Sequence, residues 1–174
     1  MDAGSDRSTV TRVTLRDIVT DADREAVLAL RRKPGQERYL GSMASHFEDA
    51  AEYAQACPRM WSVHDADEGT LVGFAMISDN IPQAVLDADD DIVGPYFLWR
   101  LLIDAAFQGR GYGQATIDAV VDYVRTRPGG DVLYTSCEPG DGSPQPFYLQ
   151  YGFTKTDRVA DGEDVLRLDL DRAQ

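Results

Sequence analysis

One segment near the middle of the chain constrains the fold more than any other, because an apolar strand, a glycine-rich turn and an amphipathic helix follow one another directly. Residues Tyr96–Ile103 are almost continuously apolar, which is typical of a central strand covered on both faces. Glycines then occupy alternate positions at Gly109, Gly111 and Gly113. The apolar residues that come next have helical spacing: Ile117, Val120, Val121 and Val124. This succession predicts an α/β domain.

The glycine turn is suited to bind an anion. Glycine lets the backbone turn tightly and approach a ligand closely, and the first turn of a helix leaves N–H groups unpaired. These donors and the helix dipole favour a phosphate. The P-loop pattern is absent, and the dinucleotide pattern GxGxxG fails because Gln114 replaces its third glycine. The pattern Gln/Arg-x-x-Gly-x-Gly/Ala matches at Gln108, Gly111 and Gly113, and a glycine turn without a ligand stays open as the alternative.

The rest of the chain predicts a mixed sheet. We expect further strands at 13–18, 61–65, 71–77, 132–137, 153–156 and 165–170, and further helices at 20–30, 36–54 and 147–151. Thr20 and Asp23 resemble a capping box at the start of the first helix. We interpret residues 1–11 as a flexible tail, 12–174 as a single domain, and the Asp-rich stretch 80–94 as a solvated loop.

A second motif, Pro146-Phe-Tyr148-Leu-Gln-Tyr-Gly152-Phe153, follows the glycine turn after a predicted strand. It matches Phe-Tyr-x-x-x-Gly-Phe, and the two motifs in this order resemble those of the GNAT superfamily of N-acetyltransferases. The resemblance covers roughly residues 61–170. Within the superfamily, stretches 98–104, 133–136 and 152–156 are most similar to bacterial spermine/spermidine acetyltransferases.

The resemblance implies an α/β (mixed α+β) fold. Its central sheet is mixed but mostly antiparallel, has about six or seven strands and splays open at the acetyl-CoA site, with about four helices around it. It also implies acetyl-CoA as the acetyl donor, no metal, and a possible homodimer. The backbone that would bind the pyrophosphate is Gln108, Gly109, Arg110, Gly111, Tyr112 and Gly113, with Gln114 beside it at the helix start. The strand edge at Leu101, Leu102 and Ile103 would pair with the pantetheine amides.

Two residues are candidates for the acid and the base of an acetyl transfer. Tyr148 matches the tyrosine that protonates the departing thiolate, with core packing as its alternative. Glu138 follows a sheet strand and is the leading candidate for the base, ahead of Asp104. Cys137 would support a ping-pong route, or it is an inert buried thiol. Many relatives hold the cofactor with an Asn where this chain has 138–143, so contacts there stay open.

The net charge of −13 disfavours nucleic acid as a partner and favours a small cationic acceptor, although acidity for solubility alone is the more common reason for such a charge. We expect a polyamine such as spermidine or spermine. The carboxylates available for its ammonium groups are Asp87, Asp89, Asp90, Asp91, Glu138 and Asp141. An aminoglycoside or a protein amino terminus fits the same composition, and a non-catalytic acyl-CoA sensor is an alternative of another class.

The composition also bears on the compartment. The sequence has no apolar run of membrane-spanning length, and residues 1–10 carry no apolar signal-peptide core, so no membrane partner is expected. Cys57 and Cys137 are far apart and belong to no metal-ligand pattern. We therefore expect reduced thiols in a cytoplasmic protein.

Overall fold

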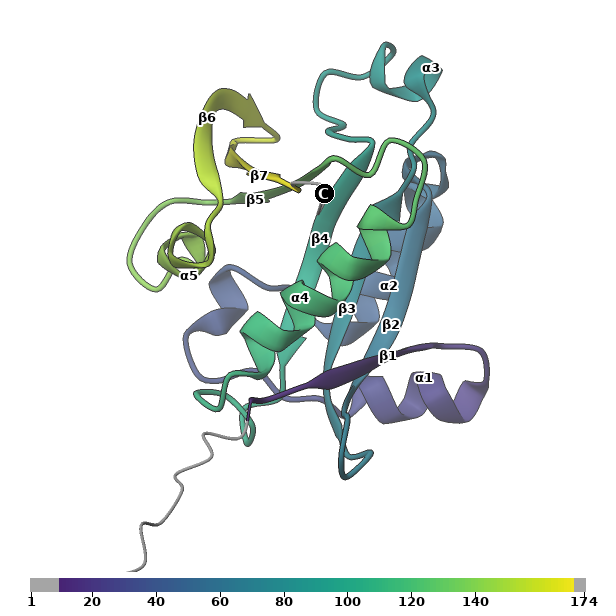
Figure 1. Cartoon of the computed structure of the whole chain (residues 1–174), viewed down its shortest axis with the longest axis vertical. Coiled ribbons are helices and arrows are strands. Elements are labelled where there is room, and N and C mark those ends of the chain that lie inside the picture. Colours follow the sequence, from purple (N-terminus) through teal and green to yellow (C-terminus); the bar gives the residue numbers. More distant parts are fainter. Residues whose placement is uncertain (1–9, 171–174) are drawn as a thin grey trace, which may run out of the picture.

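A computed structural model describes residues 10–170 as a twisted sheet with helices on both faces (Figure 1). The strands are β1 (Val13–Asp17), β2 (Pro58–Asp65), β3 (Leu71–Asp79), β4 (Tyr96–Ile103), β5 (Val132–Cys137), β6 (Thr154–Ala160) and β7 (Glu163–Asp169). The helices are α1 (Asp21–Leu28), α2 (Met43–Glu52), α3 (Gln83–Leu86), α4 (Tyr112–Arg125) and α5 (Gln145–Tyr151), with 3-10 turns η1 (Gln36–Arg38) and η2 (Ala54–Ala56). Most of the predicted tail at 1–11 lies outside the described residues.

The seven strands lie in the order β1-β2-β3-β4-β5-β7-β6. Neighbouring strands are antiparallel except β4 and β5, which run parallel. These two strands pair at two positions, Phe97 with Tyr134 and Leu98 with Thr135, and then diverge toward the end of β4 (Figure 1). The predicted mixed, mostly antiparallel sheet that splays open is therefore confirmed.

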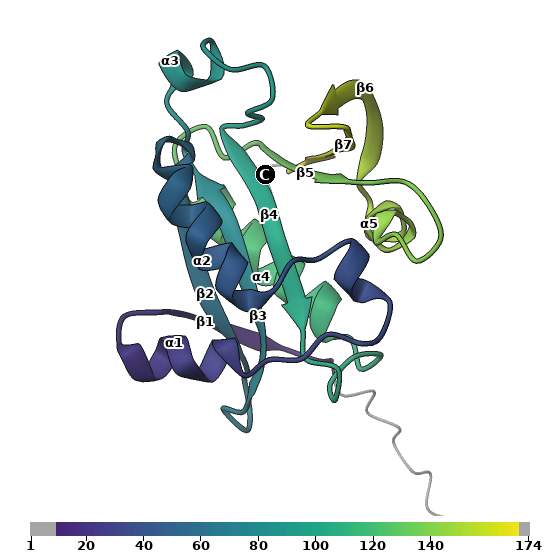
Figure 2. The same ribbon diagram turned by 180° about the vertical axis from the view of Figure 1, so that it is seen from behind.

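Alternation along β3 and β4 places one set of side chains on each face of the sheet. Ala75, Ile77 and Leu98 pack with the apolar stripe of α4. Phe74 and Leu102 point to the other face, against apolar side chains of α1 and α2, and Figure 2 shows these two helices on the side away from α4. Coverage on both faces explains why β4 is apolar almost throughout.

Two segments differ from the sequence-based expectation. The predicted helix 36–54 is interrupted: η1 comes first, and α2 begins only at Met43, where the Ser42 side chain accepts a hydrogen bond from the Ser45 N–H. The loop 80–94 contains the four-residue helix α3, so the described residues hold five α-helices instead of about four. The capping box of α1 is confirmed, with the Asp23 N–H 3.1 Å from the Thr20 hydroxyl.

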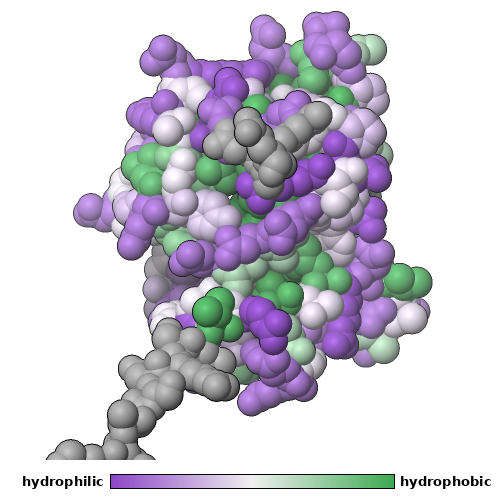
Figure 3. Space-filling model, viewed as in Figure 1, coloured by the Kyte–Doolittle hydropathy of each residue, from purple (hydrophilic) through white to green (hydrophobic). Residues whose placement is uncertain are grey.

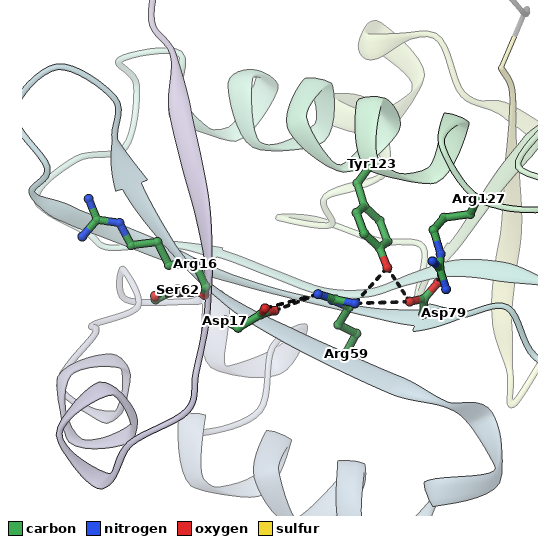
Figure 4. A network of polar contacts seen from close by, with 7 residues as sticks. All are labelled: Arg16, Asp17, Arg59, Ser62, Asp79, Tyr123 and Arg127. Carbon is green, nitrogen blue, oxygen red and sulfur yellow. Dashed lines mark hydrogen bonds and ion pairs between the residues drawn. The ribbon is translucent and has the colours of Figure 1, made fainter.

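A largely buried carboxylate fastens α4 to the sheet (Figure 4). Asp79, at the end of β3, accepts hydrogen bonds from the Tyr123 hydroxyl at 2.5 Å and from Arg127 at 3.3 Å. Arg59 of β2 lies 3.8 Å from the same carboxylate and 3.1 Å from Asp17 of β1. A buried carboxylate is stable only with such compensation, so this network ties three strands and one helix together.

The face shown in Figure 3 is mostly hydrophilic, and its apolar residues are gathered in small areas. No helix within residues 10–170 has the length and apolar character needed to cross a membrane.

Candidate active site

The gap between the diverging strands is a cavity of about 540 Å³. It brings together the last half of β4, the glycine turn, the start of α4, the end of β5 and α5. Nine of the ten predicted cofactor residues line it: Leu101, Leu102, Ile103, Gln108, Gly109, Gly111, Tyr112, Gly113 and Gln114. The tenth, Arg110, does not line the cavity; its carbonyl accepts a hydrogen bond from the Thr11 hydroxyl at 2.8 Å.

In the part of the chain that the structure describes, the second half of β4 has one edge without a neighbouring strand. The Asp104 N–H donates to the Val72 carbonyl at 2.9 Å, on the β3 side. Along a strand, the N–H groups of successive residues point to opposite edges. Because the Asp104 N–H points toward β3, the N–H groups of Leu101 and Ile103 point to the open side. The Gln108 side chain already donates to the Ile103 carbonyl at 2.8 Å. The edge thus offers backbone donors to an extended chain with amide groups.

The glycine turn is held in a backbone conformation that suits an anion. Gly109 has φ 77° and Gly111 has φ 85°, in the left-handed region where a side chain introduces strain. Gly111 is the N-cap of α4, and no side chain among residues 10–170 caps the helix there. The first N–H groups of a helix have no partner within it. A Cβ at Gly113 would come within 3.2 Å of Phe147. These features fit the pyrophosphate of a coenzyme A thioester.

Tyr148 is buried on α5 beside the cavity. Its ring packs against Phe147 and Phe153, with ring centroids 5.4 and 5.5 Å away. Burial raises the pKa of Tyr148 to about 12, while the neighbouring Thr135 hydroxyl acts in the opposite direction. The phenol is therefore a proton-bearing group at neutral pH in a cavity that can hold a thioester.

The profile described as "Acetyltransferase (GNAT) family" matches residues 24–153. The chain belongs to the GNAT acetyltransferase family. It is 30% identical over 135 residues to the spermine/spermidine N(1)-acetyltransferase of Bacillus subtilis (strain 168), which covers 78% of this chain and 84% of that protein. The family membership and this relative make the chain an acetyl-CoA-dependent N-acetyltransferase.

Solved structures of GNAT proteins share the fold. The aminoglycoside acetyltransferase AAC(6')-Ib, in complex with coenzyme A, superposes with a TM-score of 0.67 at 18% identity, over 90% of this chain and 94% of that chain. The spermidine N-acetyltransferase of Vibrio cholerae, in complex with CoA and spermine, gives 0.58 at 18% identity, over 90% and 93%. The GNAT fold is therefore confirmed.

The predicted base and its alternatives occupy different surroundings in this GNAT enzyme. Glu138 lines the cavity, but its carboxylate is paired with Arg38 at 2.8 Å. Cys137 also lines the cavity, and burial raises the pKa of its thiol, which disfavours the nucleophilic thiolate. Asp104 accepts hydrogen bonds from the Arg31 and Ala106 N–H groups at 2.8 and 2.9 Å. It therefore caps the turn after β4.

The acidic loop lies apart from the cavity of this GNAT enzyme. Figure 1 shows α3 and its loop at the end of β4 opposite the glycine turn. Arg158 of β6 donates to the Asp90 carbonyl, and the Asp161 N–H donates to Asp91 at 2.9 Å. The four aspartates expected to reach the acceptor do not line the cavity: Asp87, Asp89, Asp90 and Asp91. Asp141 does not line it either, although its carbonyl accepts from Tyr39 at 2.5 Å.

The sequence reasoning missed three cavity residues of interest, Tyr39, Arg100 and Glu163. Arg100 pairs with Asp49 of α2 at 3.2 Å, so the Asp49 carboxylate compensates its positive charge. Glu163 opens β7, behind an Asp-Gly turn that looks like an ordinary hairpin. No local pattern marks Glu163, because only the return of β7 beside β5 brings it to the cavity.

Proposed function

We propose that this GNAT enzyme transfers the acetyl group of acetyl-CoA to a primary amine of a small cationic acceptor, with a polyamine such as spermidine or spermine as the preferred substrate. The observation that carries the proposal is one cavity in which the glycine turn, the open edge of β4 and Tyr148 meet. The glycine turn and the open strand edge suit the binding of the thioester, and the Tyr148 hydroxyl would supply a proton to its sulfur.

The donor would bind along the open edge and end at the glycine turn. The N–H groups of the turn and of the first turn of α4 would hold the pyrophosphate. The amides of the pantetheine would pair with Leu101 and Ile103 as an added strand does. This arrangement holds the acetyl group at the divergence of β4 and β5, beside Tyr148, so that an acceptor amine can be brought to attack distance.

The chemistry we infer is direct attack by a neutral amine, without an acetylated enzyme. The raised pKa of the Cys137 thiol supports this route over a ping-pong one. A backbone N–H of the β4 edge, near Ile103, would stabilise the charge that develops on the carbonyl oxygen. The Tyr148 hydroxyl would give its proton to the departing sulfur. An ammonium group must lose a proton before it attacks, and Glu138 is the base that the sequence suggests.

The preference for a polyamine rests on two observations, the 30% identity to a spermine/spermidine N(1)-acetyltransferase and the net charge of −13. The field of an acidic protein attracts a polycation. The structural likeness to an aminoglycoside acetyltransferase supports a second candidate, another small polycationic amine. A non-catalytic acyl-CoA sensor with the same fold would bind the thioester without turnover.

A thiol-release assay with a panel of amines tests these proposals. We expect spermidine and spermine to give a higher kcat/KM than a monoamine of matching chain length, mainly through a lower KM. Added salt should reduce this advantage, since exposed charges are screened over about 10 Å at 0.1 M. Equal rates with monoamines would overturn the polyamine preference. Thioester binding without thiol release for any amine would favour the sensor.

A further inference from the structure

Two cavity-lining carboxylates, Glu138 and Glu163, lie next to the last pair of the ladder that joins β5 and β7. The antiparallel register pairs Cys137 with Asp164. Extended by one step past this pair, the register would place Glu138 opposite Glu163, and both residues line the active-site cavity. Like charges in directly opposed positions repel each other unless a cation lies close to them.

Within the described part of the chain, the two carboxylates differ in their counter-ions. Glu138 is paired with Arg38 at 2.8 Å. Glu163 is half-buried, forms no ion pair with any Lys or Arg among residues 10–170, and accepts a hydrogen bond from the Ser136 hydroxyl at 2.5 Å. An ionised carboxylate partly removed from water is stabilised by a cation. Glu163 therefore leaves a place in the cavity for one more positive charge.

The charge of Glu163 acts on the group that would protonate the sulfur. Burial is the main cause that raises the pKa of Tyr148 to about 12, and the negative charge of Glu163 adds to that rise. The same carboxylate adds to the effect of burial on the Cys137 thiol, whose pKa is also raised. Glu163 and Tyr148 both line the cavity.

We propose that Glu163 holds the ammonium group of the acceptor and takes its proton, which makes Glu163 a catalytic residue of the transfer. The inference rests on the proposed function, because it needs an amine in this cavity. It assigns the base to Glu163 instead of Glu138, whose carboxylate is already held by Arg38. A primary ammonium has three donors, which match the carboxylate oxygens of Glu163 and the hydroxyl of Ser136.

The protons balance as follows. An ammonium loses two protons on its way to an amide: Glu163 takes the first and passes it to solvent, and the nitrogen lone pair then forms the C–N bond with the carbonyl carbon. The C–S bond breaks with its electron pair on sulfur, which receives the proton of Tyr148. The second proton of the nitrogen replaces the one that Tyr148 has given. The net products are the acetylated amine, the free thiol and one proton.

The variant Glu163→Gln tests this assignment, because it keeps the size of the side chain and an acceptor for Ser136 while it removes the charge. With spermidine at pH 7.5, we expect kcat/KM to fall by about 100-fold or more. The Kd of acetyl-CoA and the Tm should be unchanged. The deficit should narrow as the pH rises toward the amine pKa, near 10, because a neutral amine needs no base. A purely structural defect would not be rescued in this way.

Two matched variants remove the same charge elsewhere. Glu138→Gln, in the same cavity, should cost only a few-fold in kcat/KM, and Asp90→Asn, on the distant loop, should have no effect. The assignment is overturned if Glu138→Gln is as severe as Glu163→Gln, or if the deficit of Glu163→Gln persists at pH 10.

Calorimetric titration with spermidine separates this inference from the proposed function. If the wild type acetylates no amine, the proposed function fails, and the Glu163 site is then judged by binding alone. Weaker spermidine binding to Glu163→Gln than to Glu138→Gln supports an ammonium site at Glu163. Equal binding by the wild type and Glu163→Gln, or no binding by either, overturns it.

Discussion

At the scale of single residues, Tyr148→Phe removes one hydroxyl and keeps the ring contacts with Phe147 and Phe153. We expect the single-turnover rate with spermidine to fall by about 100-fold to 10,000-fold, because a positioned acid contributes that much. The Kd of acetyl-CoA should stay the same. The pKa of about 12 means that the wild-type hydroxyl keeps its proton below that pH, so the rate should not decline between pH 7 and 10 through loss of this proton.

Tyr151→Phe is the matched control on the same helix. The Tyr151 hydroxyl donates to Asp118 at 2.6 Å and does not reach the cavity. Its removal should lower the Tm slightly, since one hydrogen bond contributes about 1 kcal/mol, without changing the rate. If both variants lose the same fraction of the rate, the two hydroxyls maintain the structure of α5. That result would contradict the role of Tyr148 as the acid.

At the scale of elements, the turn between β4 and α4 can be tested with Gly111→Val. A valine at φ 85° is strained by about 1–2 kcal/mol, and its Cβ would lie 3.2 Å from the Thr11 hydroxyl. We expect acetyl-CoA to raise the Tm of the wild type with increasing concentration, as mass action requires. Gly111→Val should lose this ligand-dependent rise, because the side chain blocks the approach of phosphate to the backbone.

Gly129→Val is the control that separates the effect of backbone strain from the effect on acetyl-CoA binding. Gly129 also has a left-handed backbone, with φ 66°, and a Cβ there meets no atom of the described residues within 4 Å. Its Tm without ligand should therefore fall through backbone strain alone, while the rise with acetyl-CoA stays intact. If both variants respond to acetyl-CoA like the wild type, the glycine turn does not hold the pyrophosphate.

At the scale of the whole molecule, the sequence predicted what local patterns encode. The strand β4, the turn and α4 were predicted because their apolar spacing reflects burial within one segment. The break before α2 was missed although Gly41 and Ser42 are a helix-start signal, because apolar spacing continued across it. Glu163 was missed for another reason: its place in the site depends on β7 returning beside β5. Pairings between distant segments leave no mark on a local pattern.

The two-position junction of β4 and β5 has a consequence for motion. Among the described residues, the two halves of the sheet, β1–β4 and β5–β7, pair with each other only around Phe97 and Leu98. Segments with few shared bonds open more readily than the core, and amide hydrogen exchange measures such openings. We expect the amides of Leu101 and Ile103, and with them β5 and α5, to exchange faster than those of β3 in the free protein. Coenzyme A, bound across the gap, should slow exchange in both halves at once. Coenzyme A, bound where a strand is missing between β4 and β5, would then set how long the two halves of the sheet stay together.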